Sequence, residues 1–176
     1  MEDYHKHVIF RSFWILFYSS ILAFPNIGLA STNPETSVGK SISYLNYADN
    51  NKFVFSPRTL QWQAINSNGK VVRSGHGSGG RGYCPDIHRS CRTPTGTYHV
   101  IAKSGPGCHS SRYPVGKGGA PMPYCMFFSH YYAIHGSPDV PNRNASHGCI
   151  RVVPGDAKWL NQNFVHIGTE VVVKPY

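Results

Sequence analysis

The sequence is poor in charged residues, which make up 14% of its 176 positions, and acidic residues number only 8. This scarcity argues against a coiled coil, a helix bundle or a disordered chain, because such proteins are usually rich in charge. The chain instead holds 18 Gly, 13 Pro and 13% aromatic residues, a composition typical of strands and turns. It has no internal repeats, and its length corresponds to one domain. We therefore expect a mostly β fold.

The sequence also lacks an apolar run of the roughly 20 residues that a membrane-spanning helix needs. One apolar run of about 13 residues, 12–24, follows Lys6 and Arg11. Small residues then lead to Ala30, and this pattern is typical of a secretory signal peptide over residues 1–30, with an uncleaved membrane anchor as the alternative. No cysteine precedes Cys84, so lipid attachment at a cysteine of the cleavage site is excluded.

A polar linker is expected at residues 31–40, and the folded domain at residues 41–176. The chain has 17 Lys and Arg, so its net charge is +9, and removal of residues 1–30 leaves this charge unchanged. A basic exported protein favours anionic partners such as cell-wall polymer or lipid headgroups, and nucleic acid is the poorer candidate because the compartment lacks it. The expected location is the periplasm or the cell envelope, and the oligomeric state stays open.

Five cysteines, an odd number, stand in a chain that is expected in an oxidising compartment, where thiols pair. Four of them lie in stretches rich in Gly, Pro and Ser: Cys84, Cys91, Cys108 and Cys125. Short loop closure favours the pairs Cys84–Cys91 and Cys108–Cys125 among three possible connectivities. Cys149 is the candidate free thiol.

A zinc site is the competing interpretation of the same region. Its candidate ligands are Cys84, His88, Cys91, Cys108 and His109. Their spacing matches none of the common zinc-binding patterns, so we expect no metal.

Hydrophobic patterning predicts strands at residues 52–55, 59–65, 96–102, 126–134 and 170–174, with an imperfect alternation at 41–47. Leu60, Trp62 and Ala64 are expected on one strand face, and Asn68-Gly69 is typical of a hairpin turn before Val71 and Val72. Long loops are expected at 75–95 and 105–123. One short helix is expected at 157–164, with Asp156 as its N-cap. The expected architecture is mostly antiparallel.

Candidate chemistry gathers around Cys149. A thiol becomes a nucleophile when an imidazole and hydrogen-bond donors favour its thiolate, and His135 and His147 are the candidate imidazoles. Turns at Gly136 and Gly148 are expected to leave backbone N–H groups free to stabilise an oxyanion. The alternative is an ordinary one, because a lone cysteine is often a buried apolar residue and a lone histidine often serves the core.

His135-Gly136-Ser137 followed by Ser146-His147-Gly148-Cys149-Ile150-Arg151 resembles the signature of the L,D-transpeptidase (YkuD-type) catalytic domain, a family of bacterial cell-wall enzymes. Residues 92–98 and 122–128 also resemble segments of this family, so the likeness covers about residues 42–174. The resemblance implies a mixed β-sandwich with one short helix; the long disulfide-stapled loops are this chain's own addition.

The resemblance also implies roles for individual residues. Cys149 would be the nucleophile and His135 the general base, while His147 and Gly148 would shape the oxyanion hole with the N–H of Cys149 as a further donor. The carbonyl of Gly136 would complete a triad. Arg151 would secure the nucleophile loop, meet a substrate carboxylate or form a structural ion pair. Ser146 would orient His147 or cap a turn.

The implied reaction takes peptidoglycan stem tetrapeptides as substrate. The thiolate would attack the carbonyl of the third residue, release D-alanine and form a thioester. A stem amine would then give a 3→3 cross-link, water would make the enzyme an L,D-carboxypeptidase, and a lysine of an envelope protein would attach that protein to the wall. No cofactor or metal is needed.

Two alternatives come from other classes of function. One is a non-catalytic envelope or host-contact binding protein on the same fold, and the other is a cysteine peptidase or amidase with a different substrate. The loop at 137–145 is short for the family and no wall-binding module is recognisable, so the acceptor stays open.

Overall fold

The computed structural model describes residues 50–113 and 119–176. The expected signal peptide, the linker and the imperfect strand at 41–47 lie outside the described residues. Within these residues, no helix is both long and apolar enough to cross a membrane.

A curled nine-stranded sheet forms the body of the protein, in the order β4-β9-β1-β2-β3-β8-β7-β6-β5. Two neighbouring pairs, β1 with β9 and β7 with β8, are parallel and the others are antiparallel, so the prediction of a mostly β, mixed fold is confirmed. The strands are β1 (Lys52–Ser56), β2 (Gln61–Ile65), β3 (Val71–Ser78), β4 (Gly96–His99), β5 (Ala102–Lys103), β6 (Met126–Phe127), β7 (Ala133–Gly136), β8 (Ile150–Val152) and β9 (Glu170–Val173).

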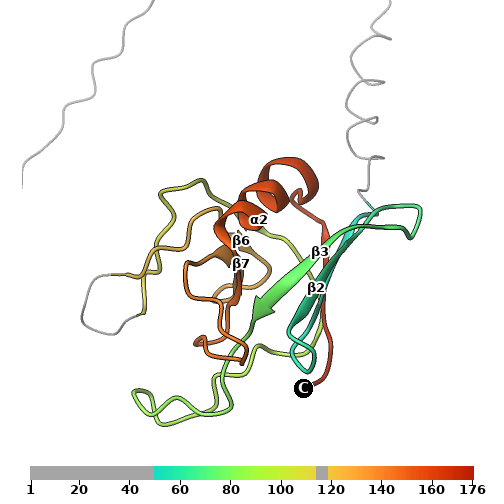
Figure 1. Cartoon of the computed structure of the whole chain (residues 1–176). Helices are drawn as coiled ribbons and strands as arrows, with labels where there is room; N and C mark the ends of the chain where they lie inside the picture. Colours follow the sequence, from blue (N-terminus) through green and yellow to red (C-terminus); the bar gives the residue numbers. More distant parts are fainter. Residues whose placement is uncertain (1–49, 114–118) are drawn as a thin grey trace, which may run out of the picture.

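The hairpin of β2 and β3 stands along one side of the molecule, and β6 and β7 lie nearer its centre, below α2 (Figure 1). The hairpin turn at Asn68-Gly69 is confirmed: the Gly69 N–H donates to the Asn66 carbonyl oxygen and the Asn66 N–H to the Lys70 carbonyl oxygen, which closes a three-residue loop. Gly69 takes the left-handed φ of 77° that the last residue of such a loop requires. Trp62 and Ala64 are fully buried, whereas Leu60 lies in the preceding turn at φ 57°. The prediction that Leu60 shares their strand face is therefore wrong.

The strand β3 continues to Ser78, so the loop predicted to begin at Gly75 begins later. The Trp62 ring lies over Gly75 at a distance that leaves no room for a side chain there. Gly75 therefore lies within a long strand, where only glycine leaves room for the Trp62 ring. The sequence alone indicates a loop at this position.

The predicted strand at 96–102 is divided between the two ends of the sheet. β4 pairs with β9, while β5 pairs with β6. Val100 between them is buried, and its N–H and C=O bond to Thr169 and Gly168. The chain thus turns a corner around one buried side chain, and this corner closes the curled sheet.

The predicted single strand at 126–134 is wrong, because the segment is a hairpin. β6 and β7 pair antiparallel, with Met126 opposite Ile134, and the Phe128 N–H donates to the Tyr132 carbonyl at 3.0 Å. The polar pair Ser129-His130 occupies the turn. The fold-back buries Met126, Phe128 and Ile134 together, which one extended strand does not allow.

The helix begins three residues earlier than predicted. α2 spans Pro154–Trp159 and continues as a π-helical turn, η1, at Leu160–Phe164. Val153 is its N-cap, and Pro154 suits the first turn because its missing N–H needs no partner there. Asp156, predicted as the N-cap, instead lies in the first turn and pairs with Arg73 at 2.7 Å. In Figure 1, α2 covers β6 and β7.

The main core lies between the curled sheet and α2. Phe53 stacks on Trp62 with ring centroids 5.8 Å apart, and Trp159 stacks on Phe164. Its fully buried large side chains include Phe53, Phe55, Trp62, Met126, Ile134, Ile150, Leu160, Val165 and Val171. This core holds β7 and β8 side by side, and both candidate catalytic residues lie on or next to these two strands.

The disulfide predictions are confirmed: Cys84 pairs with Cys91, and Cys108 pairs with Cys125. Among the described residues, Cys149 is the one free cysteine. The zinc alternative is wrong for these sulfurs. Although the sulfurs of Cys84 and Cys91 lie within 4.8 Å of a nitrogen of His147, a disulfide leaves no thiolate to bind a metal.

We expect the variant Cys108→Ser with Cys125→Ser to lose about 3 kcal/mol of stability, since the crosslink closes a loop of this size in the unfolded chain. The two cysteines are 17 positions apart, and Cys125 directly precedes β6. Chemical denaturation measures the loss. Three or five free thiols per native wild-type chain would contradict the assignment, which requires one.

Candidate active site

Cys149 directly precedes β8 and is half-buried at the wall of a cavity of about 400 Å³. Its Sγ lies 3.8 Å from the carbonyl oxygen of Tyr131, a residue of the turn between β6 and β7. Burial raises the pKa of the thiol, while a backbone hydrogen bond from Ala133 and the charge of Arg151 act in the opposite direction. The thiol therefore needs a base to become a nucleophile at neutral pH.

His135 is in β7, and the parallel register places it opposite Arg151 of β8. Side chains alternate along a strand, so Cys149, two residues before Arg151, is expected on the same sheet face as His135 and diagonal to it. Sequence positions 135 and 149 are therefore brought together by the pairing of β7 with β8.

The His135 ring is oriented by its own strand. Its Nδ1 lies 2.9 Å from the Gly136 carbonyl oxygen, which can only accept, so Nδ1 carries the proton and Nε2 is left as an acceptor. His135 is only 6% exposed, and burial lowers its pKa to about 4, with a smaller contribution from Arg151 in the same direction. The imidazole is therefore neutral at pH 7 and able to take a proton.

This low pKa predicts a pH-dependent stability. The folded pKa of about 4 lies below the unfolded value of 6.5, so the unfolded chain binds the proton more readily. The free energy of unfolding should be fully retained above pH 6.5 and fall by about 3 kcal/mol from this group as the pH decreases to 4. Denaturant titrations at pH 4 and 7 measure this, and His135→Gln should show a smaller fall. Equal falls in both proteins would contradict the assignment.

Ser146 organises the loop that carries the thiol. It is buried, its hydroxyl donates to the Cys149 carbonyl oxygen at 2.6 Å, and it accepts from the Gly148 N–H at 3.0 Å. Both bonds lie within four residues and close the loop into a compact turn. The structure thus assigns Ser146 contacts with Gly148 and Cys149.

The expectation of free N–H groups at the two glycines is wrong. The Gly148 N–H is used by Ser146, and the Gly136 N–H donates to the Pro123 carbonyl oxygen at 2.8 Å. Backbone N–H groups in folded proteins usually find such partners. Neither amide is therefore available to an oxyanion in this arrangement.

Gly148 nevertheless has a strict steric requirement. Its φ is +120°, and a Cβ would collide with the Tyr132 ring. We expect Gly148→Ala to lower stability by about 2 kcal/mol or more, because it combines backbone strain with overpacking. Thermal or chemical denaturation measures this.

The matched control for that change is Gly155→Ala in α2, where a Cβ meets nothing within 4 Å. Alanine favours helix, so this variant should be neutral or slightly more stable. Equal stability of the two variants would contradict the steric role of Gly148.

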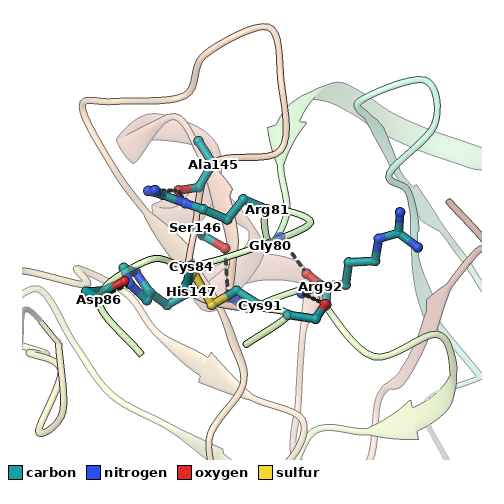
Figure 2. The surroundings of a disulfide bond; sticks show 12 residues. Gly80, Arg81, Cys84, Asp86, Cys91, Arg92, Ala145, Ser146 and His147 are labelled. Atoms are coloured by element: carbon teal, nitrogen blue, oxygen red, sulfur yellow. Dashed lines mark hydrogen bonds and ion pairs between the residues drawn. A yellow bond between two sulfur atoms is a disulfide. The ribbon is translucent and has the colours of Figure 1, made fainter. Parts of the chain in front are cut away.

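His147 contacts the loop of the first disulfide. Its Nε2 lies 2.8 Å from Oδ2 of Asp86, and its ring stacks on Tyr113 with centroids 4.4 Å apart. Figure 2 shows Asp86 and His147 beside the Cys84–Cys91 bond. The hydrogen bond to His147 lowers the pKa of Asp86, so this carboxylate is ionised at neutral pH. Sequence reasoning missed Asp86, because no motif marks it.

Arg151 is engaged by a neighbouring loop. Its guanidinium forms an ion pair of 2.9 Å with Asp139, whose carboxylate is largely exposed. Since its charge acts on the pKa of both His135 and Cys149, Arg151 lies close to both. It links the nucleophile segment to the loop at 137–145.

The cavity in front of Cys149 is basic and aromatic, and it has no acidic residue among those that line it. Both disulfide-stapled loops contribute to it, together with the turn between β6 and β7. Its lining includes Arg89, Ser90, His109, Arg112, Tyr113, His130, Tyr131, Tyr132 and His147. Such a cavity suits an anionic, partly apolar ligand.

Comparison with known proteins identifies the family to which this fold and this site belong. Residues 26–173 match the sequence model of the L,D-transpeptidase catalytic domain family (YkuD). The chain therefore belongs to this family. No curated protein sequence matches it significantly.

Solved structures agree with that membership. The chain is 28% identical to the L,D-transpeptidase of Xylanimonas cellulosilytica, with a TM-score of 0.61, over 81% of this chain and 70% of that one. An L,D-transpeptidase from Mycobacterium smegmatis is 21% identical, with a TM-score of 0.59, over 72% of this chain and 59% of that one.

A third similar structure is L,D-transpeptidase 3 from Mycobacterium tuberculosis in complex with a faropenem-derived adduct. It is 22% identical, with a TM-score of 0.57, over 72% of this chain and 61% of that one. The two mycobacterial structures share the fold, and this chain spans less than two thirds of their length.

Proposed function

We propose that this protein is an L,D-transpeptidase that acts on peptidoglycan stem tetrapeptides through a thioester at Cys149. The observation that carries the proposal is the pairing of β7 with β8, which brings a buried, neutral His135 to the sheet face expected to carry a cavity-lining thiol. A thiol and an oriented imidazole are the parts that nucleophilic acyl transfer requires.

In the first step, Nε2 of His135 takes the proton of Cys149, and the sulfur attacks the carbonyl carbon of the third stem residue. The tetrahedral oxyanion then collapses, the bond to the terminal D-alanine breaks, and His135 returns the proton to the departing amine. The Gly148 amide is occupied by Ser146, and the Nε2–H of His147 is donated to the Asp86 carboxylate. The proposed oxyanion donor is therefore the Cys149 N–H, with His147 shaping the site beside it.

The acceptor decides the product in the second step. An amine of a neighbouring stem would attack the thioester and form a 3→3 cross-link. Water would release a tripeptide, and the enzyme would then be an L,D-carboxypeptidase. A lysine of an envelope protein would become attached to the wall. Each acceptor restores the thiol of Cys149.

Two features support an anionic substrate outside the cytoplasm. The cavity presents Arg89 and Arg112 without an acidic lining residue, and wall peptides carry carboxylates. Two disulfides favour an oxidising compartment, in agreement with an exported chain in the periplasm or cell envelope.

Incubation with disaccharide-tetrapeptide, followed by intact-mass analysis and chromatography of the products, tests the function. A dimer of stem peptides with an acyl adduct on the protein supports a transpeptidase, whereas a tripeptide without dimer supports a carboxypeptidase. Faropenem is a second probe, because a protein of the same fold carries an adduct derived from it. A folded protein with a free thiol and no adduct with either probe would favour the binding role.

A further inference from the structure

The segment that carries the first disulfide is hydrogen-bonded to the loop that ends at Cys149, residues 145–149, which we call the nucleophile loop. These bonds come from Arg81, which precedes Cys84 in the sequence. The Arg81 N–H donates to the Ser146 carbonyl oxygen at 3.0 Å, and the Arg81 guanidinium donates to the Ala145 carbonyl oxygen at 2.8 Å. Figure 2 shows these contacts beside the disulfide. The backbone before His147 and the backbone before Cys84 therefore form one unit.

The disulfide then turns this segment into a compact ring. Cys84 and Cys91 are seven positions apart and both buried, and the Cys84 N–H donates to the Arg89 carbonyl oxygen at 2.9 Å. The carbonyl oxygen of Cys91 also lies 3.5 Å from the position that a Cβ on Gly148 would occupy. The disulfide-closed segment therefore also lies next to the nucleophile loop at Gly148.

Asp86 stands within this ring and reaches back to His147. His147 is held on one side by the Asp86 carboxylate at 2.8 Å and on the other by the Tyr113 ring. The Asp86 side chain is 44% exposed and that of His147 is 21% exposed, so this hydrogen bond contributes little to global stability. The contact instead fixes the orientation of the His147 ring, which lies two residues before Cys149 in the sequence.

We propose that Asp86, held in place by the Cys84–Cys91 disulfide, is a positioning residue that orients His147 for the acylation of Cys149. The inference rests on the proposed function. It assigns to the first disulfide a role in catalysis in addition to loop closure. Removal of either the carboxylate or the disulfide releases the His147 ring while Cys149 and His135 stay in place.

The test compares two reactions of Cys149 in full-length variants. Acylation by faropenem builds an oxyanion and needs an oriented His147, whereas alkylation by iodoacetamide needs only the thiolate. We expect Asp86→Ala to slow acylation about 10-fold or more and to leave alkylation within about twofold of wild type. Asp86→Asn keeps a hydrogen-bonding oxygen and should restore acylation to within about threefold of wild type.

The variant Cys84→Ser with Cys91→Ser should slow acylation to a similar extent. Adding Asp86→Ala to it should give no further slowing, since both changes release the same ring. The control is Glu170→Gln, which removes an ion pair of 3.2 Å with Lys52 away from the cavity and should leave both reactions unchanged. Thermal unfolding of each variant shows whether it is folded.

Three outcomes would overturn the inference. Wild-type acylation rates in Asp86→Ala would do so and leave the proposed function intact. Equal slowing of acylation and alkylation would show a general effect on the thiol and not an effect through His147. A wild-type protein that is alkylated but never acylated would overturn the proposed function together with this inference.

Discussion

Cys149→Ala is expected to abolish the acyl adduct and every peptide product. Among the described residues Cys149 is the one cysteine outside a disulfide, so no second thiol can replace it. The rate of product formation should fall by at least about 10³-fold, because the covalent route is lost. Intact mass after incubation with tetrapeptide or faropenem gives the first readout, and D-alanine release gives the second.

The control for Cys149→Ala is a measurement of the stability of the variant. Both disulfides remain, and the substitution removes only a sulfur at the cavity wall. The variant should therefore unfold in a single transition close to that of the wild type. A covalent adduct on the folded alanine variant would place the nucleophile at another residue and contradict the proposed mechanism.

His135→Gln is expected to reduce acylation of Cys149 by about 10²- to 10⁴-fold, the range of a lost general base. Glutamine has an amide N–H for the Gly136 carbonyl oxygen, which Nδ1 of His135 contacts at 2.9 Å, but it has no basic nitrogen. Because burial raises the pKa of the thiol, the variant has little thiolate at neutral pH. The loss should become smaller as the pH rises.

The matched control is His166→Gln, an exposed histidine outside the cavity lining. Its acylation rate and pH profile should equal those of the wild type. A wild-type rate in His135→Gln at pH 7 would exclude His135 as the base and direct attention to His147.

Local sequence patterns were sufficient where neighbouring residues decide the structure. Asn68-Gly69 predicts its hairpin because few residues accept a positive φ. The pairs Cys84–Cys91 and Cys108–Cys125 follow from short loop closure, which favours near neighbours.

The same patterns gave wrong predictions where the packing of several elements into one core determines the structure. The strand predicted at 126–134 folds into a hairpin because Met126 and Ile134 share one core, and the predicted strand at 96–102 divides at the buried Val100. Asp156 pairs with Arg73 of β3 and does not cap the helix, whose first residue is Pro154. Core packing and this ion pair are contacts that the hydrophobic pattern of one segment does not contain.

By itself, the sequence determined the mostly β class, the hairpin turn, the two disulfides and the motif that carries Cys149, because all of these depend on composition or on near neighbours. Only the tertiary structure decided the contacts of the site. It brought Asp86 to His147 across 61 positions and occupied the amide of Gly136 with the carbonyl oxygen of Pro123. Such contacts depend on chain segments that meet in space, and no local pattern encodes them.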